Sequence, residues 1–314
     1  MKSAIIEVKG VSKRYGEIHA VNAADLVIYK GEIFSLIGHN GAGKSTLFKM
    51  MLGLLQPTNG EILIRGKNVN GHAFREVKRR IGYLPENIVF YDHLTGIETL
   101  HFIGKLKGAD LKTCPSLLDK MGLLKAARRP VRGYSKGMRQ RLGFAQALLG
   151  EPEILFLDEP TTGLDPAGIR EFYQFLQELK EQGVTIILSS HNLAQIQEQV
   201  DRIALMKMGD ILTVGSVAEL RQQLDLPLHI QVRLDPKAKD ALRRALSGFA
   251  ECELEFGEGS LMVTCNTKRK MPLLTTLATT EGVTDIQIQE PSLEDLFLGY
   301  VSRGATSQAV SALT

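Results

Sequence analysis

The chain has 314 residues, 44% of them hydrophobic, and a formal net charge of +3. This length and apolar content suffice for one large or two smaller domains, whereas the near balance of charges argues against a dedicated nucleic-acid surface, which would be strongly basic. The three cysteines, Cys114, Cys252 and Cys265, form no C-x-x-C pair, so we expect a reducing compartment and neither a disulfide framework nor a thiolate metal site.

Hydropathy bears on membrane insertion. No apolar run approaches the ~18 residues that a membrane-spanning helix needs. Charges at Lys2 and Glu7 come too early for a secretory signal. We therefore expect a soluble protein whose membrane role has to come through a partner.

The first two thirds of the chain predict an α/β core. Short apolar runs predict strands at five places, residues 5–8, 23–29, 33–37, 154–157 and 185–188. One helix is expected over 44–55, stopped by Pro57 and Gly60, and an amphipathic helix over about 167–181. Residues from about 71 to 150 are expected to be mostly helical and irregular. Strands alternating with helices indicate a parallel sheet.

The pattern changes near residue 221 to that of a small α+β domain. The predicted elements are a strand at 229–234, a helix at 236–247, a hairpin of 251–256 and 261–265, a helix at 268–280 and a strand at 283–289. This βαββαβ order is typical of the ferredoxin-like, split-βαβ arrangement. We expect an accessory domain over 221–290 and a C-terminal tail over 291–314, frayed after Gly304.

A phosphate-binding motif lies between a predicted strand and a predicted helix. The segment from Gly38 to Thr46 matches G-x-x-x-x-G-K-[ST]. Its glycines let backbone N–H groups face phosphate oxygens, and the helix start adds its positive dipole end. Lys44 is expected to reach the β- and γ-phosphates, and the Ser45 hydroxyl to bind Mg²⁺. The predicted nucleotide-binding residues here are Gly38, His39, Asn40, Gly41, Ala42, Gly43, Lys44, Ser45 and Thr46.

Two adjacent carboxylates, Asp158 and Glu159, follow the predicted strand at 154–157. An acidic residue at the carboxyl end of a buried strand can hold Mg²⁺ or its water. The next side chain points elsewhere and can accept a proton from attacking water. Downstream of a phosphate loop, this pair predicts nucleotide hydrolysis, with Asp158 as metal ligand and Glu159 as general base.

Phosphate loops occur in many enzymes, so further motifs decide the family. The segment Tyr134 to Arg141 resembles the signature motif of ATP-binding cassette (ABC) proteins, usually Leu-Ser-Gly-Gly-Gln. Ser135 and Gly137 match that motif, whereas Tyr134, Lys136 and Met138 depart from it.

Three more positions support the same resemblance. Asp165, in Gly-Leu-Asp-Pro, resembles the D-loop residue, and His191 resembles the switch histidine. Tyr15 is placed like the aromatic residue that stacks on adenine. Singly, Tyr15 is more often a packing residue and His191 a core residue, but their order and spacing together identify an ABC cassette over residues 1–220.

The resemblance implies a fold and a mechanism. The fold is a P-loop NTPase cassette with a parallel-sheet core, an antiparallel β subdomain and a helical subdomain over about 87–150. ATP is held between two copies of the chain, with Ser135 and Gly137 of one copy contacting the γ-phosphate on the other copy's loop. The implied cofactors are ATP and Mg²⁺, and the implied location is peripheral, on the cytoplasmic side of a bacterial inner membrane.

Glu86 departs from the family pattern. Most ABC proteins have Gln at the position of Glu86 in Tyr83-Leu84-Pro85-Glu86-Asn87, where it contacts Mg²⁺ and senses the membrane partner. A carboxylate still offers an oxygen ligand but adds negative charge beside phosphate. We expect retained function with altered metal affinity or coupling.

Several segments resemble one branch of the family, the ATPases of NosDFY systems. They are Gly38 to Asn40, Tyr83 to Asn87, Tyr134 to Arg141, Ala145 to Pro152 and Pro291 to Leu296. Such systems mature the copper sites of nitrous oxide reductase. The resemblance implies a second copy of the chain, a NosY-like permease and, through it, a periplasmic NosD-like protein as partners, with copper or sulfur species as cargo and no nucleic acid.

Other functions remain open at this point. The nearest alternative is the ATPase of a generic drug, lipid or sodium exporter. A soluble ABC protein acting on ribosomes or in DNA repair is disfavoured, because those proteins resemble tandem cassettes or carry coiled-coil insertions. A non-enzymatic scaffold is disfavoured by intact Lys44, Asp158, Glu159 and His191. Met206-Lys207-Met208 is interpreted as part of a strand rather than a thioether copper site.

Overall fold

The computed structural model describes residues 3–224 and 226–311, without side-chain detail for Pro236 and residues 303–311. The chain divides into two compact units, Met1–Gly215 and Ser216–Thr314. Among the described residues, no helix is both long and apolar enough to cross a bilayer.

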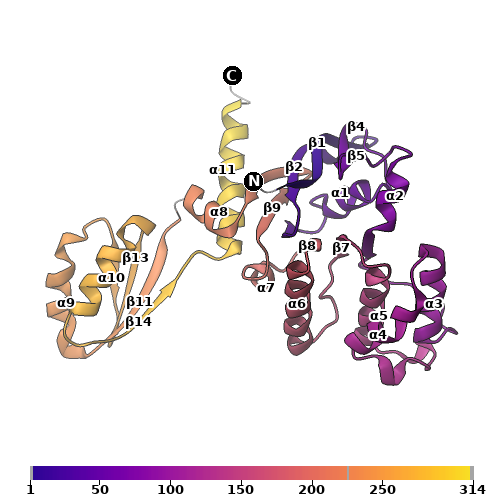
Figure 1. Ribbon diagram of the computed structural model, residues 1–314. Coiled ribbons are helices and arrows are strands. Elements are labelled where there is room, and N and C mark those ends of the chain that lie inside the picture. Colours follow the sequence, from indigo (N-terminus) through magenta and orange to yellow (C-terminus); the bar gives the residue numbers. More distant parts are fainter. Residues whose placement is uncertain (1–2, 225, 312–314) are drawn as a thin grey trace. The chain divides into compact units, whose positions relative to one another are not determined.

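A six-stranded sheet forms the centre of the first unit (Figure 1). Its order is β10-β9-β3-β8-β7-β6, and all neighbouring pairs are parallel except β9 with β10. The strands are β3 Ile33–Ile37, β6 Ile81–Leu84, β7 Ile154–Asp158, β8 Thr185–Ser190, β9 Arg202–Lys207 and β10 Asp210–Gly215. The carboxyl ends of the parallel strands meet at one edge, so the loops that follow them gather there.

A second, antiparallel sheet of this unit has the order β2-β1-β4-β5. Its strands are β1 Ala4–Tyr15, β2 Ile18–Tyr29, β4 Asn59–Ile64 and β5 Lys67–Asn68. The first two are longer than the apolar runs at 5–8 and 23–29, because one face of this sheet carries exposed polar residues such as Lys9 and Arg14.

Seven helices of the first unit are described in addition to short 3-10 turns. They are α1 Lys44–Met51, α2 Phe74–Arg79, α3 Gly96–Lys107, α4 Cys114–Lys120, α5 Lys136–Leu148, α6 Pro166–Glu181 and α7 Leu193–Ile196. Helices α3, α4 and α5 gather into a helical subdomain (Figure 1). Thr95 and Glu98 form a reciprocal capping box at the start of α3, which fixes where that helix begins.

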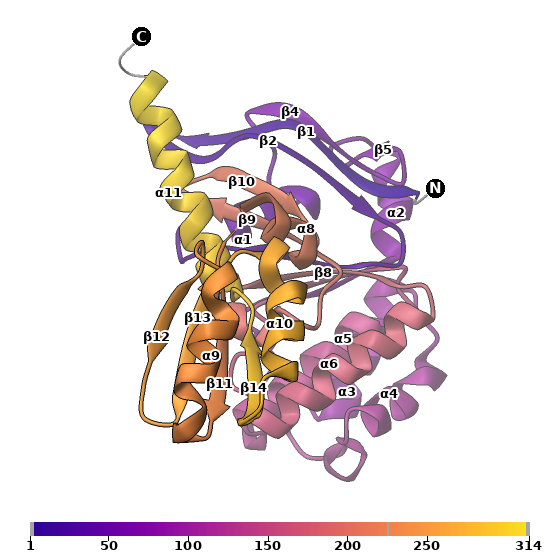
Figure 2. The ribbon, with the colours of Figure 1, turned by 90° about the vertical axis from the view of Figure 1, so that its left-hand side faces the viewer.

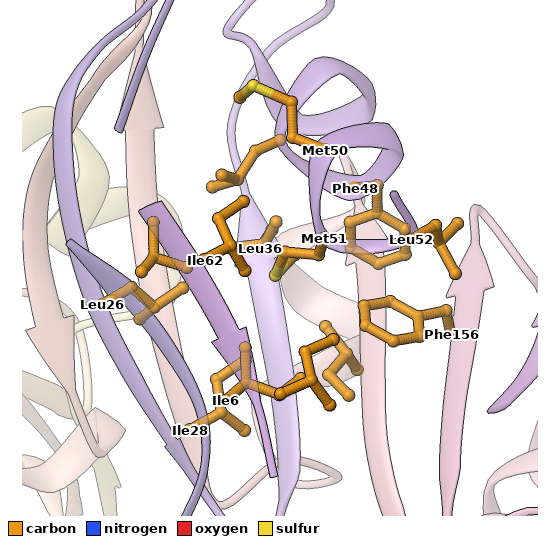
Figure 3. Packing of buried hydrophobic residues seen from close by; sticks show 14 of the residues in the cluster. Ile6, Leu26, Ile28, Leu36, Phe48, Met50, Met51, Leu52, Ile62 and Phe156 are labelled. Atoms are coloured by element: carbon orange, nitrogen blue, oxygen red, sulfur yellow. The ribbon is translucent and has the colours of Figure 1, made fainter. Parts of the chain in front are cut away.

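The main core lies between the two sheets and includes α1 (Figure 3). Ile6 and Ile62 of the antiparallel sheet face Leu36 of β3, and all three are fully buried. The rings of Phe48 in α1 and Phe156 in β7 meet edge to face, with centroids 5.5 Å apart. Each such buried side chain contributes about 1.5–3 kcal/mol. The core therefore anchors α1, and with it the phosphate loop that precedes α1.

Two predictions for this unit are wrong. Residues 81–84 form a parallel strand, β6, inside the region expected to be helical and irregular. The strand contains Gly82, where a Cβ would overlap the Ala147 carbonyl oxygen of α5. Glycine has a low strand propensity, so the close approach of α5, and not local propensity, explains its presence in this strand. Helix α1 ends at Met51 instead of Leu55, because Gly53 takes a left-handed backbone (φ 62) and closes the last turn.

The second unit contains a four-stranded antiparallel sheet of order β12-β13-β11-β14. Its elements are β11 Leu228–Leu234, α9 Lys239–Ala245, β12 Glu253–Phe256, β13 Ser260–Cys265, α10 Lys270–Thr279 and β14 Val283–Gln289. Both helices cover one face of the sheet (Figure 2). Alternate residues of β11, such as Ile230 and Val232, are buried against Leu242 of α9 and Leu277 of α10. This is the ferredoxin-like arrangement that the sequence predicts.

The predicted C-terminal tail from residue 291 is wrong over most of its length. Residues Leu293–Ser311 form helix α11, which contacts α8 (Val217–Leu224) within the same unit. Ser292 and Asp295 form reciprocal side-chain to backbone hydrogen bonds at its start (2.9 and 3.2 Å). Leu296 and Phe297 are buried. A cap and an apolar face therefore make a helix of this segment, while residues 312–314 lie outside the described residues.

Candidate functional site: a phosphate loop and a carboxylate–histidine pair

The predicted phosphate loop connects β3 to α1 at the carboxyl edge of the parallel sheet. Gly43 has a left-handed backbone (φ 102), and a Cβ there would overlap the Ala20 carbonyl oxygen. A Cβ at Gly38 would overlap the Met206 carbonyl oxygen. Glycine is required at both positions, because the loop packs directly against neighbouring backbone. The loop leaves His39, Asn40, Gly41 and Ser45 exposed, Gly43 and Thr46 half-buried, and Ala42 buried.

Lys44 lies inside this loop. Its ammonium donates to the carbonyl oxygens of Gly38 (2.5 Å) and His39 (3.2 Å). Burial lowers the pKa of Lys44, and the carboxylates of Glu159, Asp158 and Glu86 act in the opposite direction. All three acidic groups therefore lie within electrostatic reach of Lys44. A buried cation beside the amino end of a helix is suited to a polyanion such as a nucleotide phosphate.

Asp158 ends β7 and is held by the neighbouring strand. Its Oδ1 accepts a 2.5 Å hydrogen bond from the Ser189 hydroxyl, and Ser189 Oγ accepts one from the backbone N–H of Glu159 (3.0 Å). The register of the parallel pair places Asp158 opposite Ser189. One serine therefore positions both members of the predicted acidic pair.

Glu159 and His191 form a direct contact. Glu159 has a left-handed backbone (φ 48), uncommon for a residue with a side chain. Its Oε2 lies 2.8 Å from Nδ1 of His191, which follows β8. The carboxylate is nearly buried, whereas the imidazole is about half exposed. The two predicted catalytic residues, distant in sequence, thus meet beside Asp158.

Glu86 follows β6 and is exposed. Burial raises the pKa of the nearby Tyr83 hydroxyl, and the charges of Asp158 and Glu86 raise it further. Glu86 thus acts electrostatically on both Tyr83 and Lys44. The donor set of Ser45 hydroxyl, Asp158 and Glu86 carboxylates consists of hard oxygen ligands, and so fits Mg²⁺, which is held by one or two carboxylates plus substrate phosphates.

The predicted signature residues lie at the start of α5. Ser135 is exposed and caps that helix, since its Oγ accepts from the Met138 N–H (3.2 Å). Tyr134 is buried and donates to the Ala126 carbonyl oxygen (2.7 Å). Gly137 faces the Gly163 carbonyl in the predicted D-loop. The helix amino end, with its serine, is therefore presented at the surface.

The last two predicted residues have different surroundings. Asp165 caps α6 by accepting from the Gly168 N–H (2.9 Å), so it has a structural role in the single chain. Tyr15 ends β1 with its ring half exposed, and the Lys13 ammonium lies 5.3 Å from the ring centroid. A half-exposed aromatic ring of this kind is suited to stack on a planar group.

The site also uses residues that sequence reasoning misses. Ser189 bridges the acidic pair, and Gln140 of α5 donates from its buried amide to the Pro160 carbonyl oxygen just after Glu159 (2.8 Å). The strand prediction at 185–188 stops one residue before Ser189. Only strand register brings Ser189 to Asp158, and register between parallel strands cannot be derived from one sequence.

A phosphate loop followed by an acidic pair at the end of a neighbouring parallel strand defines the class of P-loop nucleotide hydrolases. Comparison with known proteins identifies the family. The model of the family described as ABC transporter matches residues 21–162.

Three curated relatives differ in how much of their own length the chain matches. The bacitracin transport ATP-binding protein BcrA of Enterococcus faecalis is 41% identical over 70% of this chain and 71% of its own length. BcrA of Bacillus licheniformis is 34% identical over 96% of this chain and 99% of its own length. An ABC transporter ATP-binding protein of Synechocystis sp. is 40% identical, and the matched part spans just under two thirds of it, 65%.

Solved structures agree. An ATP-binding subunit of an ABC transporter shares 32% identity with a TM-score of 0.65, over 70% of this chain and 92% of that one. A dimeric cassette in a post-hydrolysis state with ADP and Pi shares 27% identity with a TM-score of 0.63, over 68% and 99%. The chain belongs to the ATP-binding proteins of ABC transporters, and it is an ATPase with the fold of their cassettes.

Proposed function

We propose that this protein drives a membrane permease by binding ATP between two copies of itself and hydrolysing it. The observation that carries this proposal is the 2.8 Å contact of Glu159 Oε2 with His191 Nδ1, beside Asp158 and Lys44. A nearly buried carboxylate held by a half-exposed imidazole is suited to accept a proton from water at the sheet edge.

The residues of the site take separate roles. The loop N–H groups and Lys44 bind the β- and γ-phosphates. Ser45, Asp158 and Glu86 hold Mg²⁺, which supplies charge neutralisation on the phosphates when bound. Glu159 orients the attacking water and takes its proton, and His191 fixes the carboxylate. Tyr15 stacks on the base.

The single chain lacks one side of this site. Ser135 is exposed at the amino end of α5, where the positive end of the helix dipole favours an anion. We assign Ser135, Gly137 and Asp165 to the phosphate and loop of a second copy, related by a two-fold axis.

A complementation experiment tests this arrangement. The variants Lys44→Ala and Ser135→Arg are each expected to be inactive, because each homodimer lacks one half of both sites. A mixture forms heterodimers in which one site has an intact loop from one chain and an intact signature from the other. Equal mixing is expected to recover up to about one quarter of the wild-type ATPase rate, since half the dimers carry one of two sites.

Two outcomes would contradict the proposed arrangement. Full ATPase activity of Ser135→Arg alone, or no recovery in a mixture whose heterodimers are demonstrated by tag pull-down, contradicts the composite site. As a control, Glu178→Gln, an exposed change on α6, mixed with Lys44→Ala measures simple dilution.

For the cargo, we propose copper or sulfur processing of the NosDFY type. The supporting observations are the sequence segments Gly38 to Asn40, Tyr83 to Asn87 and Tyr134 to Arg141. The partners are then a NosY-like permease in the bacterial inner membrane, with this chain peripheral on its cytoplasmic side, and a periplasmic NosD-like protein. Deletion of the gene tests this: nitrous oxide reductase is expected to accumulate without its copper centres, and restoration requires active Glu159.

A second cargo is favoured by a separate observation. BcrA of Bacillus licheniformis, named for bacitracin transport, matches 96% of this chain, including the second unit. Export of a peptide antibiotic by the same cassette predicts that deletion lowers resistance to bacitracin and leaves nitrous oxide reductase fully loaded. The two proposals thus give opposite results in one deletion strain.

A further inference from the structure

Two of the three cysteines come together in the second unit, although twelve residues separate them in the sequence. Cys252 directly precedes β12 and Cys265 ends β13. The antiparallel register pairs Glu253 with Thr264, so continuing it by one step places Cys252 opposite Cys265. Directly opposed residues in antiparallel strands have Cα atoms about 4.5–5.5 Å apart, within the roughly 4.4–6.8 Å that a disulfide spans.

The side chains complete this cross-strand pair. Cys252 packs against the core cluster that contains Cys265, and the Cys265 thiol is hydrogen-bonded to the Cys252 sulfur. Cys265 is buried, whereas Cys252 is half-buried and therefore open to a small reagent. The third cysteine, Cys114, is fully buried at the start of α4 in the other unit.

We propose that Cys252 and Cys265 form an oxidisable dithiol, which a low-molecular-weight disulfide such as oxidised glutathione converts to a disulfide between β12 and β13. This modification site belongs to the second unit, whereas the phosphate loop and the Glu159–His191 pair belong to the first.

The surroundings set the order of the two steps. Burial raises the pKa of Cys265 to about 11, and the neighbouring Cys252 adds to this. Burial also raises the pKa of Cys252, but the hydrogen bond from Cys265 and the guanidinium of Arg269 oppose that rise. Cys252 is therefore the first thiol to ionise and the attacking group, while Cys265 is the resolving group.

The exchange is balanced. The Cys252 thiolate attacks one sulfur of the glutathione disulfide, which forms a mixed disulfide and releases one glutathione thiolate. Cys265 then loses its proton, attacks the Cys252 sulfur and releases the second glutathione. The protein loses two electrons and two protons, and the glutathione disulfide gains them.

The test uses the full chain with oxidised glutathione in mildly alkaline buffer, followed by alkylation, intact mass and peptide mapping. Wild type is expected to lose two of its three free thiols and two hydrogens in mass, with Cys252 and Cys265 peptides linked within one chain. Cys265→Ser is expected to stop at the mixed disulfide on Cys252. Cys252→Ser is expected to remain unmodified at Cys265.

Matched controls separate a specific site from general oxidation. Cys114→Ser is expected to behave as wild type, and far-UV circular dichroism of every variant checks folding. The proposal is overturned if folded wild type keeps three free thiols, stops at the mixed disulfide, or forms links that involve Cys114 or a second chain.

Discussion

At the residue scale, the backbone of Glu159 separates the functions of two adjacent carboxylates. A left-handed non-glycine residue costs about 1–3 kcal/mol, yet Glu159 adopts φ 48. With this backbone, Asp158 meets Ser189 and Glu159 meets His191. The strained backbone thus lies at the point where the carboxylates of Asp158 and Glu159 turn towards different partners.

We predict that Glu159→Gln keeps ATP binding but loses hydrolysis about 10²–10⁴-fold, because an amide cannot accept the proton. The ATP-bound dimer is then expected to persist. Phosphate release and size-exclusion chromatography with ATP measure both effects, with Glu178→Gln as a surface control. A variant hydrolysing at the wild-type rate would remove Glu159 as the base.

At the element scale, the start of α3 is packed against the residue before the signature. A Cβ on Gly96 would overlap the hydroxyl of Tyr134, which is anchored on the Ala126 carbonyl oxygen. The N-terminal turn of α3 and the turn before α5 therefore form one rigid contact within the helical subdomain.

We predict that Gly96→Ala lowers the free energy of unfolding by about 1–3 kcal/mol, because the buried hydroxyl has no room to move. Adding Tyr134→Phe removes the overlapping atom and is expected to recover part of that loss. Denaturant unfolding of the single and double variants measures the coupling. Gly248→Ala, at an open position, is the matched control; equal losses at 96 and 248 contradict the packing argument.

A second element-scale prediction concerns pH. Burial lowers the pKa of Lys107, at the end of α3, from 10.5 to about 8, and its ammonium donates to the Leu149 carbonyl oxygen. Between those values the unfolded chain binds the extra proton, so stability rises with pH through this residue. Urea unfolding is expected to show a rise from pH 8 towards 10.5 that is smaller in Lys107→Met. Lys105→Met, an exposed neighbour on α3, should leave the wild-type slope unchanged.

At the scale of the whole molecule, the proposed function divides the nucleotide site between two copies of the chain. Ser135 at the exposed amino end of α5 is not part of the cluster of Lys44, Glu159 and His191 described above. We therefore predict that the ATPase rate per chain rises steeply with protein concentration until the dimer saturates. Enzyme-coupled ATPase assays over a dilution series, with light scattering for mass, measure this. A constant rate per chain down to the monomer would contradict the model.

Local patterns in the sequence determined much of this protein. The phosphate loop, the acidic pair and the ferredoxin-like order follow from glycine spacing and hydrophobic periodicity, which depend on neighbouring residues only. The Ser-x-x-Asp cap of α11 is also present in the sequence at 292–295, at the start of the segment expected to be a C-terminal tail.

Tertiary structure alone decided the pairings. Ser189 reaches Asp158, Cys252 reaches Cys265, and β6 forms beside β7, because strand register and the packing of α5 bring distant residues together. The periodicity of a single sequence predicts which face of an element is buried. It does not predict which other element packs or pairs with that element, since any apolar strand can pair with any other. The motifs and most secondary-structure elements could be predicted from local sequence, whereas the contacts between distant side chains could be determined only from the fold.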